Sequence, residues 1–184
     1  ARLGEGLYAF LLRTLCGQFR EAWTFEAERL RRRRRAVISV DNRMLHYLAI
    51  EGALLLIVAL LSWRALAFLL AVATIAIALL EGFNYVAHYG LLRKTRADGT
   101  IEALAPIHSW NSSRRMNNAA LFNMGRHADH HRHMARSYEQ LEAVQKGSQL
   151  PSGYAAALLI ALVPPLWRRV MDPRARKAQG GLLG

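Results

Sequence analysis

Cysteine is almost absent from this 184-residue sequence, in which Cys16 is the only one. A single cysteine excludes a disulfide within the chain and any zinc or iron–sulfur site built from cysteines. Acidic residues are also scarce: 13 aspartates and glutamates stand against 25 lysines and arginines, so the net charge is +12. We recognise no internal repeat and no signal peptide, and the start at Ala1 instead of methionine leads us to expect a cut or processed end.

Apolar residues make up 53% of the chain and gather in two stretches, 45–83 and 154–167, with arginines just outside them. A nucleic-acid-binding protein would instead carry its basic residues on one face, interleaved with aromatic residues. We therefore expect no nucleic-acid partner. Apolar blocks flanked by arginines are typical of membrane spans whose flanks face the cytoplasm. The sequence predicts an integral membrane protein surrounded by lipid.

The first apolar stretch predicts a transmembrane hairpin. Residues 45–63 are interrupted only by His46 and Glu51, and residues 65–80 add a second run after a tight Ser62-Trp63-Arg64 corner. About 20 apolar helical residues are enough to cross a bilayer core. The alternative, a buried hairpin in a soluble helical protein, would need a large partner to cover it.

The whole chain is expected to be all-α and to divide into four segments. An amphipathic, interfacial helix ending in five arginines (1–43) precedes the hairpin (44–92), and a polar, histidine-bearing region (93–150) follows it. In the last segment (151–184), prolines break a short apolar run, which predicts a re-entrant or interfacial helix, or one packed under the histidine region. We expect the basic, glycine-rich tail from Arg168 onward to be poorly ordered.

The strongest local motif is His-x-x-His-His at His127, His130 and His131. On a helix these positions fall within an arc of about 100°. Three crowded imidazoles would repel one another if protonated, whereas a metal ion binds the neutral rings, and imidazole suits iron, copper or zinc. The alternative is a surface histidine cluster without a metal.

Two neighbours of this motif point elsewhere on the same helix. His133 points about 60° beyond His130, which makes it a weaker candidate ligand. Asp129 points about 170° from the three imidazoles, so we expect it to pair with Arg126 or Arg132, or to lie near the metal without binding it.

Two other positions are expected to approach the motif. His88 lies at the cytoplasmic end of the second predicted span, on the same side of the membrane as the cluster. His108 and Asn111, in the stretch HSWNS, could orient metal-bound imidazoles through hydrogen bonds, and His108 is also a candidate ligand.

Four motifs, NYVAHYGLLR, HSWNS, LFNMGRHADHH and VPPLWRRVMDPR, occur in this order between Gly4 and Arg174. Together they resemble the membrane-bound alkane 1-monooxygenases, within the membrane fatty-acid desaturase and hydroxylase superfamily. The resemblance implies a helical fold of about six spans with a cytoplasmic histidine-rich domain. It also implies a multi-pass protein of the bacterial inner membrane with its active site on the cytoplasmic side.

The same resemblance implies a reaction. Such enzymes hold two non-haem iron ions with nine histidines and use dioxygen to convert medium-chain n-alkanes, entering from the bilayer, to 1-alkanols. Rubredoxin delivers the electrons. No catalytic residue beyond the metal ligands is implied.

Carried over position by position, the family's ligands fall on His88, His127, His130 and His131. The other five belong to two histidine boxes that do not occur in this chain and would precede it. We therefore expect a C-terminal portion that is inactive alone.

The chain departs from the family pattern at three places, with Ala87, Gly125 and Ala128 where glutamate, glutamine and serine are usual. These changes leave the substrate range open. Alternatives are a xylene-type or cymene-type methyl hydroxylase, a fatty-acid desaturase, a histidine-rich metal transporter and an inactive accessory fragment.

Overall fold

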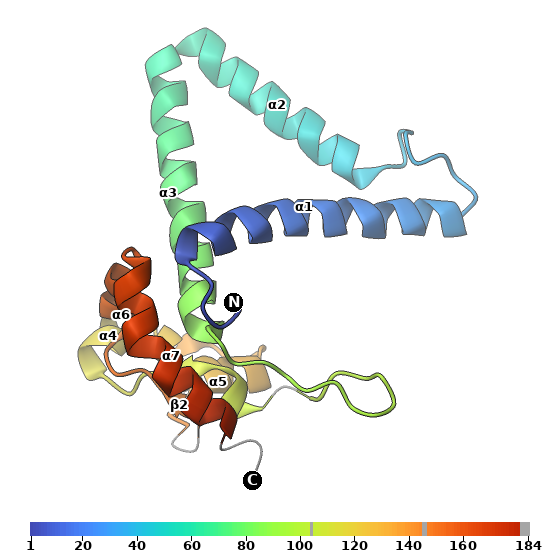
Figure 1. The fold of residues 1–184 in the computed structure, drawn as a ribbon. Helices are drawn as coiled ribbons and strands as arrows, with labels where there is room; N and C mark the ends of the chain where they lie inside the picture. The colour runs from blue at the N-terminus through green and yellow to red at the C-terminus, as the bar shows by residue number, and fades with distance from the viewer. Residues whose placement is uncertain (104, 145–146, 181–184) are drawn as a thin grey trace. The chain divides into compact units, whose positions relative to one another are not determined.

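The computed structural model describes residues 1–103, 105–144 and 147–180, and most of them are helical (Figure 1). The chain divides into two compact units. One, here called the hairpin unit, comprises Leu11–Leu79; the other, the histidine unit, comprises Ala1–Phe10 with Leu80–Gly184.

The hairpin unit contains three long helices: most of α1 (Leu7–Arg32), all of α2 (Arg43–Leu61) and the first part of α3 (Trp63–His88). Ser62 alone separates α2 from α3 (Figure 1). Its N–H donates to the Val58 carbonyl at 2.8 Å, and its hydroxyl accepts from the Ala65 N–H at 3.3 Å. One residue thus ends one helix and begins the next. A corner is present where it was predicted, but it is shorter than expected, because Trp63 and Arg64 already belong to α3.

Both α2 and α3 are long and apolar enough to cross a membrane. All of their residues are described, and no side chain from Arg43 to Leu80 is buried. Apolar surface of this extent is not stable in water, and a bilayer would cover it. The exposure therefore favours the transmembrane hairpin over a buried one.

The histidine unit has an aromatic core at the end of α3. The rings of Tyr85 and Tyr89 lie 5.4 Å and 5.2 Å from the Trp167 ring, centroid to centroid, and all three side chains are buried. The Trp110 Nε1 donates to the Tyr89 carbonyl at 2.8 Å. Tyr154 donates its hydroxyl to the Trp110 carbonyl. Aromatic burial of this kind is among the largest contributions to core stability.

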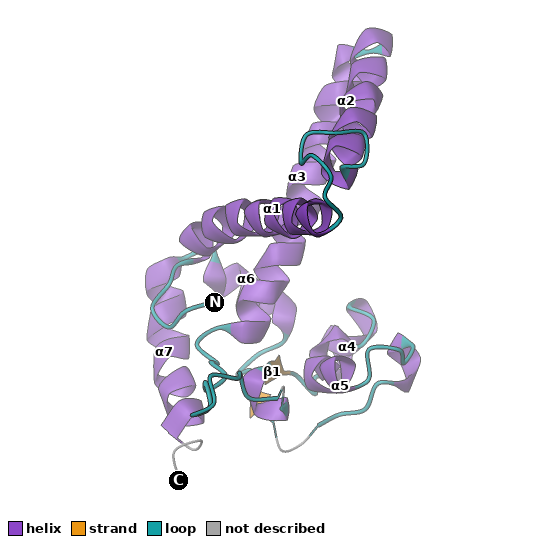
Figure 2. Cartoon of the chain, turned by 90° about the vertical axis from the view of Figure 1, so that its right-hand side faces the viewer, coloured by secondary structure: helices purple, strands orange, loops and turns teal. Residues whose placement is uncertain are grey.

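The histidine unit contains further helices and short turns (Figure 2). They are α4 (Arg115–Ala120), α5 (His127–Arg132), α6 (Tyr154–Ala161) and α7 (Pro164–Gly180), with 3-10 turns at Pro106–His108, Met124–Arg126 and Tyr138–Gln140. A parallel pair of two-residue strands, β1 (Trp110–Asn111) and β2 (Ser148–Gln149), was not part of the all-α expectation.

The expectation of a poorly ordered tail was wrong for residues 168–180, and the last four residues lie outside the described ones. Pro164 begins α7, a position where its missing N–H has no intrahelical partner to lose. Trp167, Met171 and Ala175 recur every four residues and are all buried. This stripe packs α7 against the histidine unit and orders it.

Candidate metal centre

His88 is the last residue of α3, and the chain turns directly after it. Gly90 has a left-handed backbone (φ 67°), and a Cβ there would lie 2.8 Å from the Ala175 Cβ, so a side chain does not fit. The His88 Nδ1 lies 3.2 Å from the His108 carbonyl oxygen. Because a carbonyl only accepts, Nδ1 carries the proton, and Nε2 presents a lone pair.

The other histidines come from α5, which Asn111 holds at its start. The Asn111 Oδ1 accepts from the Ala128 N–H at 2.9 Å. Its Nδ2 donates to the carbonyls of Ser109 and Ser148 at 3.0 Å and 3.2 Å. One buried amide thus joins α5 to both strands. Asn111 positions the histidine helix, and its influence on a bound metal stays a prediction.

The three departures from the family pattern are all buried. Gly125 leaves no room for a side chain: a Cβ would lie 2.2 Å from the Asn118 Oδ1 and 2.5 Å from the Ser112 carbonyl oxygen. The Gly125 carbonyl also accepts from the Ser112 N–H at 2.8 Å. A glutamine at this position would therefore require the turn before α5 to rearrange. Ala87 and Ala128 are small apolar residues buried in the core, so neither offers a polar group there.

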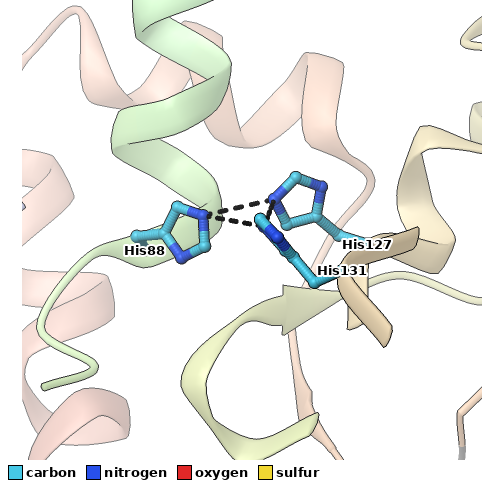
Figure 3. Close-up of side chains that lie close together, drawn as sticks. All are labelled: His88, His127 and His131. Atoms are coloured by element: carbon cyan, nitrogen blue, oxygen red, sulfur yellow. Dashed lines mark hydrogen bonds between the residues drawn. The ribbon is translucent and has the colours of Figure 1, made fainter. Parts of the chain in front are cut away.

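Three imidazoles converge from these two elements (Figure 3). The His88 Nε2 lies 3.3 Å from the Nε2 of His127 and 3.3 Å from that of His131, and the last two are 2.9 Å apart. A metal that bonds imidazole nitrogens at about 2.0–2.1 Å, with right-angled to tetrahedral geometry, places them about 2.9–3.4 Å apart. The triangle fits three ligands of one metal ion.

The electrostatics favour neutral rings. Burial, followed by the charges that His88, His131 and His130 would carry, lowers the pKa of His127 to about 3. Burial also lowers the pKa of His131. At neutral pH the site therefore presents neutral nitrogens, which is the form that binds iron, zinc or copper.

His130 is a neighbour of this triangle and is not part of it. Its ring centroid lies 6.0 Å from that of His127 and 5.7 Å from that of His131. Positions four apart on a helix lie one above the other, whereas position 130 is about 100° away from 131. Its role as a ligand stays a prediction.

Asp129 has different partners from those expected. It contacts His133 Nδ1 at 3.0 Å and Arg136 at 3.3 Å, instead of Arg126 or Arg132, and accepts from the Glu142 N–H at 2.9 Å. Burial alone would raise the pKa of Asp129, but these contacts hold it below its usual value. Asp129 therefore ties the chain after α5 in place, and it turns His133 away from the triangle.

The His108 side chain does not belong to the triangle of converging nitrogens. Its Nδ1 accepts from the Ala105 N–H at 2.9 Å, and its Nε2 lies 3.0 Å from Glu102 Oε1. Its contribution to the site is its carbonyl oxygen, which fixes the His88 ring. The motif HSWNS indicated that His108 would lie close to the site. The contact with His88 is made by the backbone carbonyl of His108, and the type of a side chain does not indicate such a backbone contact.

A hollow of about 450 Å³ adjoins the triangle, with His88, His131, Leu91 and Leu92 in its lining. On another side, the buried Tyr154 ring lies 6.3 Å from the His127 ring. No sequence pattern indicated Tyr154, since this residue stands at the start of an apolar run and reaches the site only through tertiary packing.

Comparison of the sequence with known proteins shows the family to which this chain is similar. The fatty acid desaturase family matches residues 1–157. The chain is 41% identical over 182 residues to alkane 1-monooxygenase 2 of Pseudomonas aeruginosa, covering 98% of this chain and 48% of that protein. It is 42% identical over 175 residues to the alkane 1-monooxygenase of Pseudomonas putida, covering 95% and 44%.

A relative with another substrate in its name also matches. The chain is 31% identical over 166 residues to the hydroxylase component of xylene/toluene monooxygenase from Pseudomonas putida, covering 89% of this chain and 43% of that protein. The chain spans about half the length of these relatives.

The resemblance to alkane 1-monooxygenases is thus confirmed, and the two exposed apolar helices together with these relatives indicate a membrane protein. With most of its length matched, this chain belongs to the fatty acid desaturase family.

Proposed function

We propose that this chain forms part of a membrane-bound, rubredoxin-dependent alkane 1-monooxygenase that hydroxylates the terminal carbon of medium-chain n-alkanes. The observation that carries the proposal is the convergence of three histidine Nε2 atoms at the end of an apolar helix. The relatives named alkane 1-monooxygenase support the substrate class. Iron, when bound, supplies the oxidising power for attack on a strong C–H bond with dioxygen.

His88, His127 and His131 hold one iron ion in this proposal, and His130, the next ring along α5, is assigned to a second. The His108 carbonyl keeps the His88 ring oriented. Asn111 and Asp129 hold the two ends of the histidine helix. The remaining ligands of a di-iron centre would come from histidines outside this chain, so we propose that the chain alone does not hydroxylate alkanes.

The proposal extends to the side of the membrane and to the electron donor. Arginines flank the apolar hairpin, and this charge bias supports a bacterial inner-membrane protein whose hairpin ends and histidines face the cytoplasm. Exposed basic residues of the histidine unit would attract an acidic rubredoxin; they are Arg93, Lys94, Arg114, Arg115 and Arg132. If so, the rubredoxin-dependent rate falls as ionic strength rises.

The metal assignment is tested by iron content. Each of the single variants His88→Ala, His127→Ala and His131→Ala should reduce the iron bound by the purified protein, because each removes one of the three converging imidazoles. His133→Ala is the matched control, since that ring contacts Asp129. Unchanged iron content in any one of the three variants would remove that residue from the site, and a loss in the control would point to a folding effect instead.

A methyl hydroxylase of the xylene type is the second candidate, favoured by the 31% identity to the xylene/toluene enzyme. Products from octane and from xylene, formed by the whole enzyme that contains this chain under the same reductant supply, distinguish the two. Formation of 1-octanol supports the first, and a hydroxymethyl arene without octanol supports the second.

A further inference from the structure

The connection between α1 and α2 is a fixed corner held by one carboxylate. The Glu26 carboxylate accepts two bonds from Arg29, at 2.7 Å and 2.6 Å, and a third from the Arg43 N–H at 2.7 Å. Arg29 also donates to the Asp41 carbonyl at 2.7 Å. Charge-assisted bonds of this kind are stronger than neutral ones. They fix the end of α1 against the start of α2.

A buried amide completes the corner. The Asn42 side chain, 1% exposed, accepts from the N–H groups of Met44 and Leu45 at 2.9 Å and 3.3 Å, and so caps α2. It also donates to the Val37 carbonyl at 2.7 Å. With Leu30 fully buried beneath it, this loop has a definite shape, and the arginines on it are presented from a rigid base.

These arginines surround a hollow of about 550 Å³. Its lining, here called the arginine hollow, consists of Arg29, Leu30, Arg33, Arg35, Val40, Asp41, Arg43 and His46. Two of its positive charges are offset, since Arg29 pairs with Glu26 and Arg35 lies 3.7 Å from Asp41. Within the described part of the chain, Arg33 has no ion-pair partner, and Arg43 shares the single charge of Glu26 with Arg29. The arginine hollow therefore keeps an excess of positive charge, which favours an anion.

The position of the hollow indicates which anion. Arg43 is the first residue of α2, whose apolar run begins two residues later. Val40, which lines the hollow, is 85% exposed, and Ile38 beside it is 81% exposed. Guanidinium groups next to exposed apolar side chains at the start of a span match the boundary between headgroups and acyl chains, where basic pockets bind anionic lipids. Free phosphate would gain nothing from the apolar side chains.

We propose that the arginine hollow binds the headgroup of an anionic phospholipid, with the phosphate between the Arg33 and Arg43 guanidinium groups. The planar guanidinium fork matches phosphate oxygens two at a time. The acyl chains of that lipid would lie along α2. This site is separate from the histidine triangle in chemistry and does not depend on the proposed oxygenase activity.

The test measures which lipid stays with the protein. The protein is incorporated into nanodiscs containing equal amounts of phosphatidylglycerol and phosphatidylcholine, extracted in mild detergent, and its retained lipids are quantified by mass spectrometry. We expect about one phosphatidylglycerol per chain and little phosphatidylcholine. The double variant R33Q/R43Q should retain about tenfold less phosphatidylglycerol.

A matched control comes from the same arginine run. Arg31 and Arg32 do not line the hollow, so R31Q/R32Q removes the same charge and should retain phosphatidylglycerol as the unmodified protein does. Equal loss in both double variants would mean diffuse charge attraction and would overturn the site. Release of the lipid by inorganic phosphate alone would also overturn the lipid assignment, as would displacement by an acidic protein such as rubredoxin.

A second variant distinguishes misfolding of R33Q/R43Q from the loss of lipid recognition. R33K/R43K keeps the charge but loses the planar fork, so partial retention is expected with unchanged helix content by circular dichroism. Retention by the lysine variant as low as in the glutamine variant, with both folded, supports recognition by the guanidinium fork. Full retention by R33Q/R43Q overturns the proposal.

Discussion

The hairpin from Arg43 to Leu80 and the core of the histidine unit are both rich in apolar residues, yet they are stabilised differently. No side chain of the hairpin is buried, whereas the histidine unit buries Tyr85, Tyr89 and Trp167 completely. The hairpin must therefore gain its stability from lipid or from a further part of the protein. A metal site that needs fixed ligand positions is therefore expected in the unit that carries its own core.

The largest change in stability is expected when one tryptophan in each region is replaced in turn. Trp167 is 1% exposed and contacts two buried tyrosines, whereas Trp63 is 71% exposed at the α2–α3 corner. Trp167→Ala should reduce the free energy of unfolding in detergent by about 3–5 kcal/mol, because it leaves a cavity. Trp63→Ala should change it by less than about 0.5 kcal/mol. Equal losses, measured by thermal unfolding, would contradict the contrast.

The second test uses pH. The folded-state pKa of His127, about 3, is below the ordinary value of 6.5, so folding favours the neutral ring. This stabilisation is fully present above pH 6.5 and is lost as the pH falls from 6.5 toward 3. Metal-free protein should therefore lose about 2–4 kcal/mol of stability over that range. Urea unfolding at several pH values measures it.

His127→Gln is the variant that isolates this effect, because glutamine does not titrate. Its stability should vary less between pH 6.5 and pH 3 than that of the unmodified protein. His46→Gln is the matched control, because it removes a histidine that is not part of the triangle. Identical pH profiles for His127→Gln and the unmodified protein would show that the buried ring is not the source.

The elements that the sequence predicted well are those defined by local pattern. The hairpin follows from the length of its apolar runs, and the pairing of His127 with His131 follows from helical spacing. The strand pair could not be predicted, because Asn111 meets Ser148 across 37 residues through tertiary packing. In α7 the spacing of Trp167 and Met171 was a usable signal that the basic composition of the tail concealed.

The third test concerns the link between the strands and the histidine helix. Asn111→Ala removes the acceptor for the Ala128 N–H and two buried donors, which should cost about 1–3 kcal/mol. Iron affinity should fall with it, since α5 carries two of the converging rings. Gln149→Ala, an exposed amide that bonds only to local carbonyls, is the control and should have little effect on either quantity. Unchanged stability in Asn111→Ala would mean that α5 is held by other contacts.

The smallest expected effect is a gain of stability within the hairpin unit. Arg34 follows the end of α1 with a left-handed backbone (φ 54°). The Arg35 N–H donates to the Leu30 carbonyl at 3.0 Å, and the Arg34 N–H donates to the Arg31 carbonyl at 2.9 Å. This pair of bonds is the helix-ending motif in which glycine is usual, because a Cβ there is strained by about 1–2 kcal/mol.

Arg34→Gly should therefore stabilise this corner by about 0.5–1 kcal/mol, after the greater freedom of glycine in the unfolded chain is subtracted. Amide exchange at Arg35 should slow by about two- to fivefold, because that N–H opens only when the motif does. Arg32→Gly, at the last residue of α1, should have the opposite sign, since glycine is less stable than other residues in a helical backbone, by at most about 1 kcal/mol. Arg34 does not line the arginine hollow, so phosphatidylglycerol retention should not change in Arg34→Gly. Faster exchange at Arg35 in Arg34→Gly would mean that the corner is set by the arginine side chain and not by the backbone, and the hairpin unit would then lack a rigid base for its arginines.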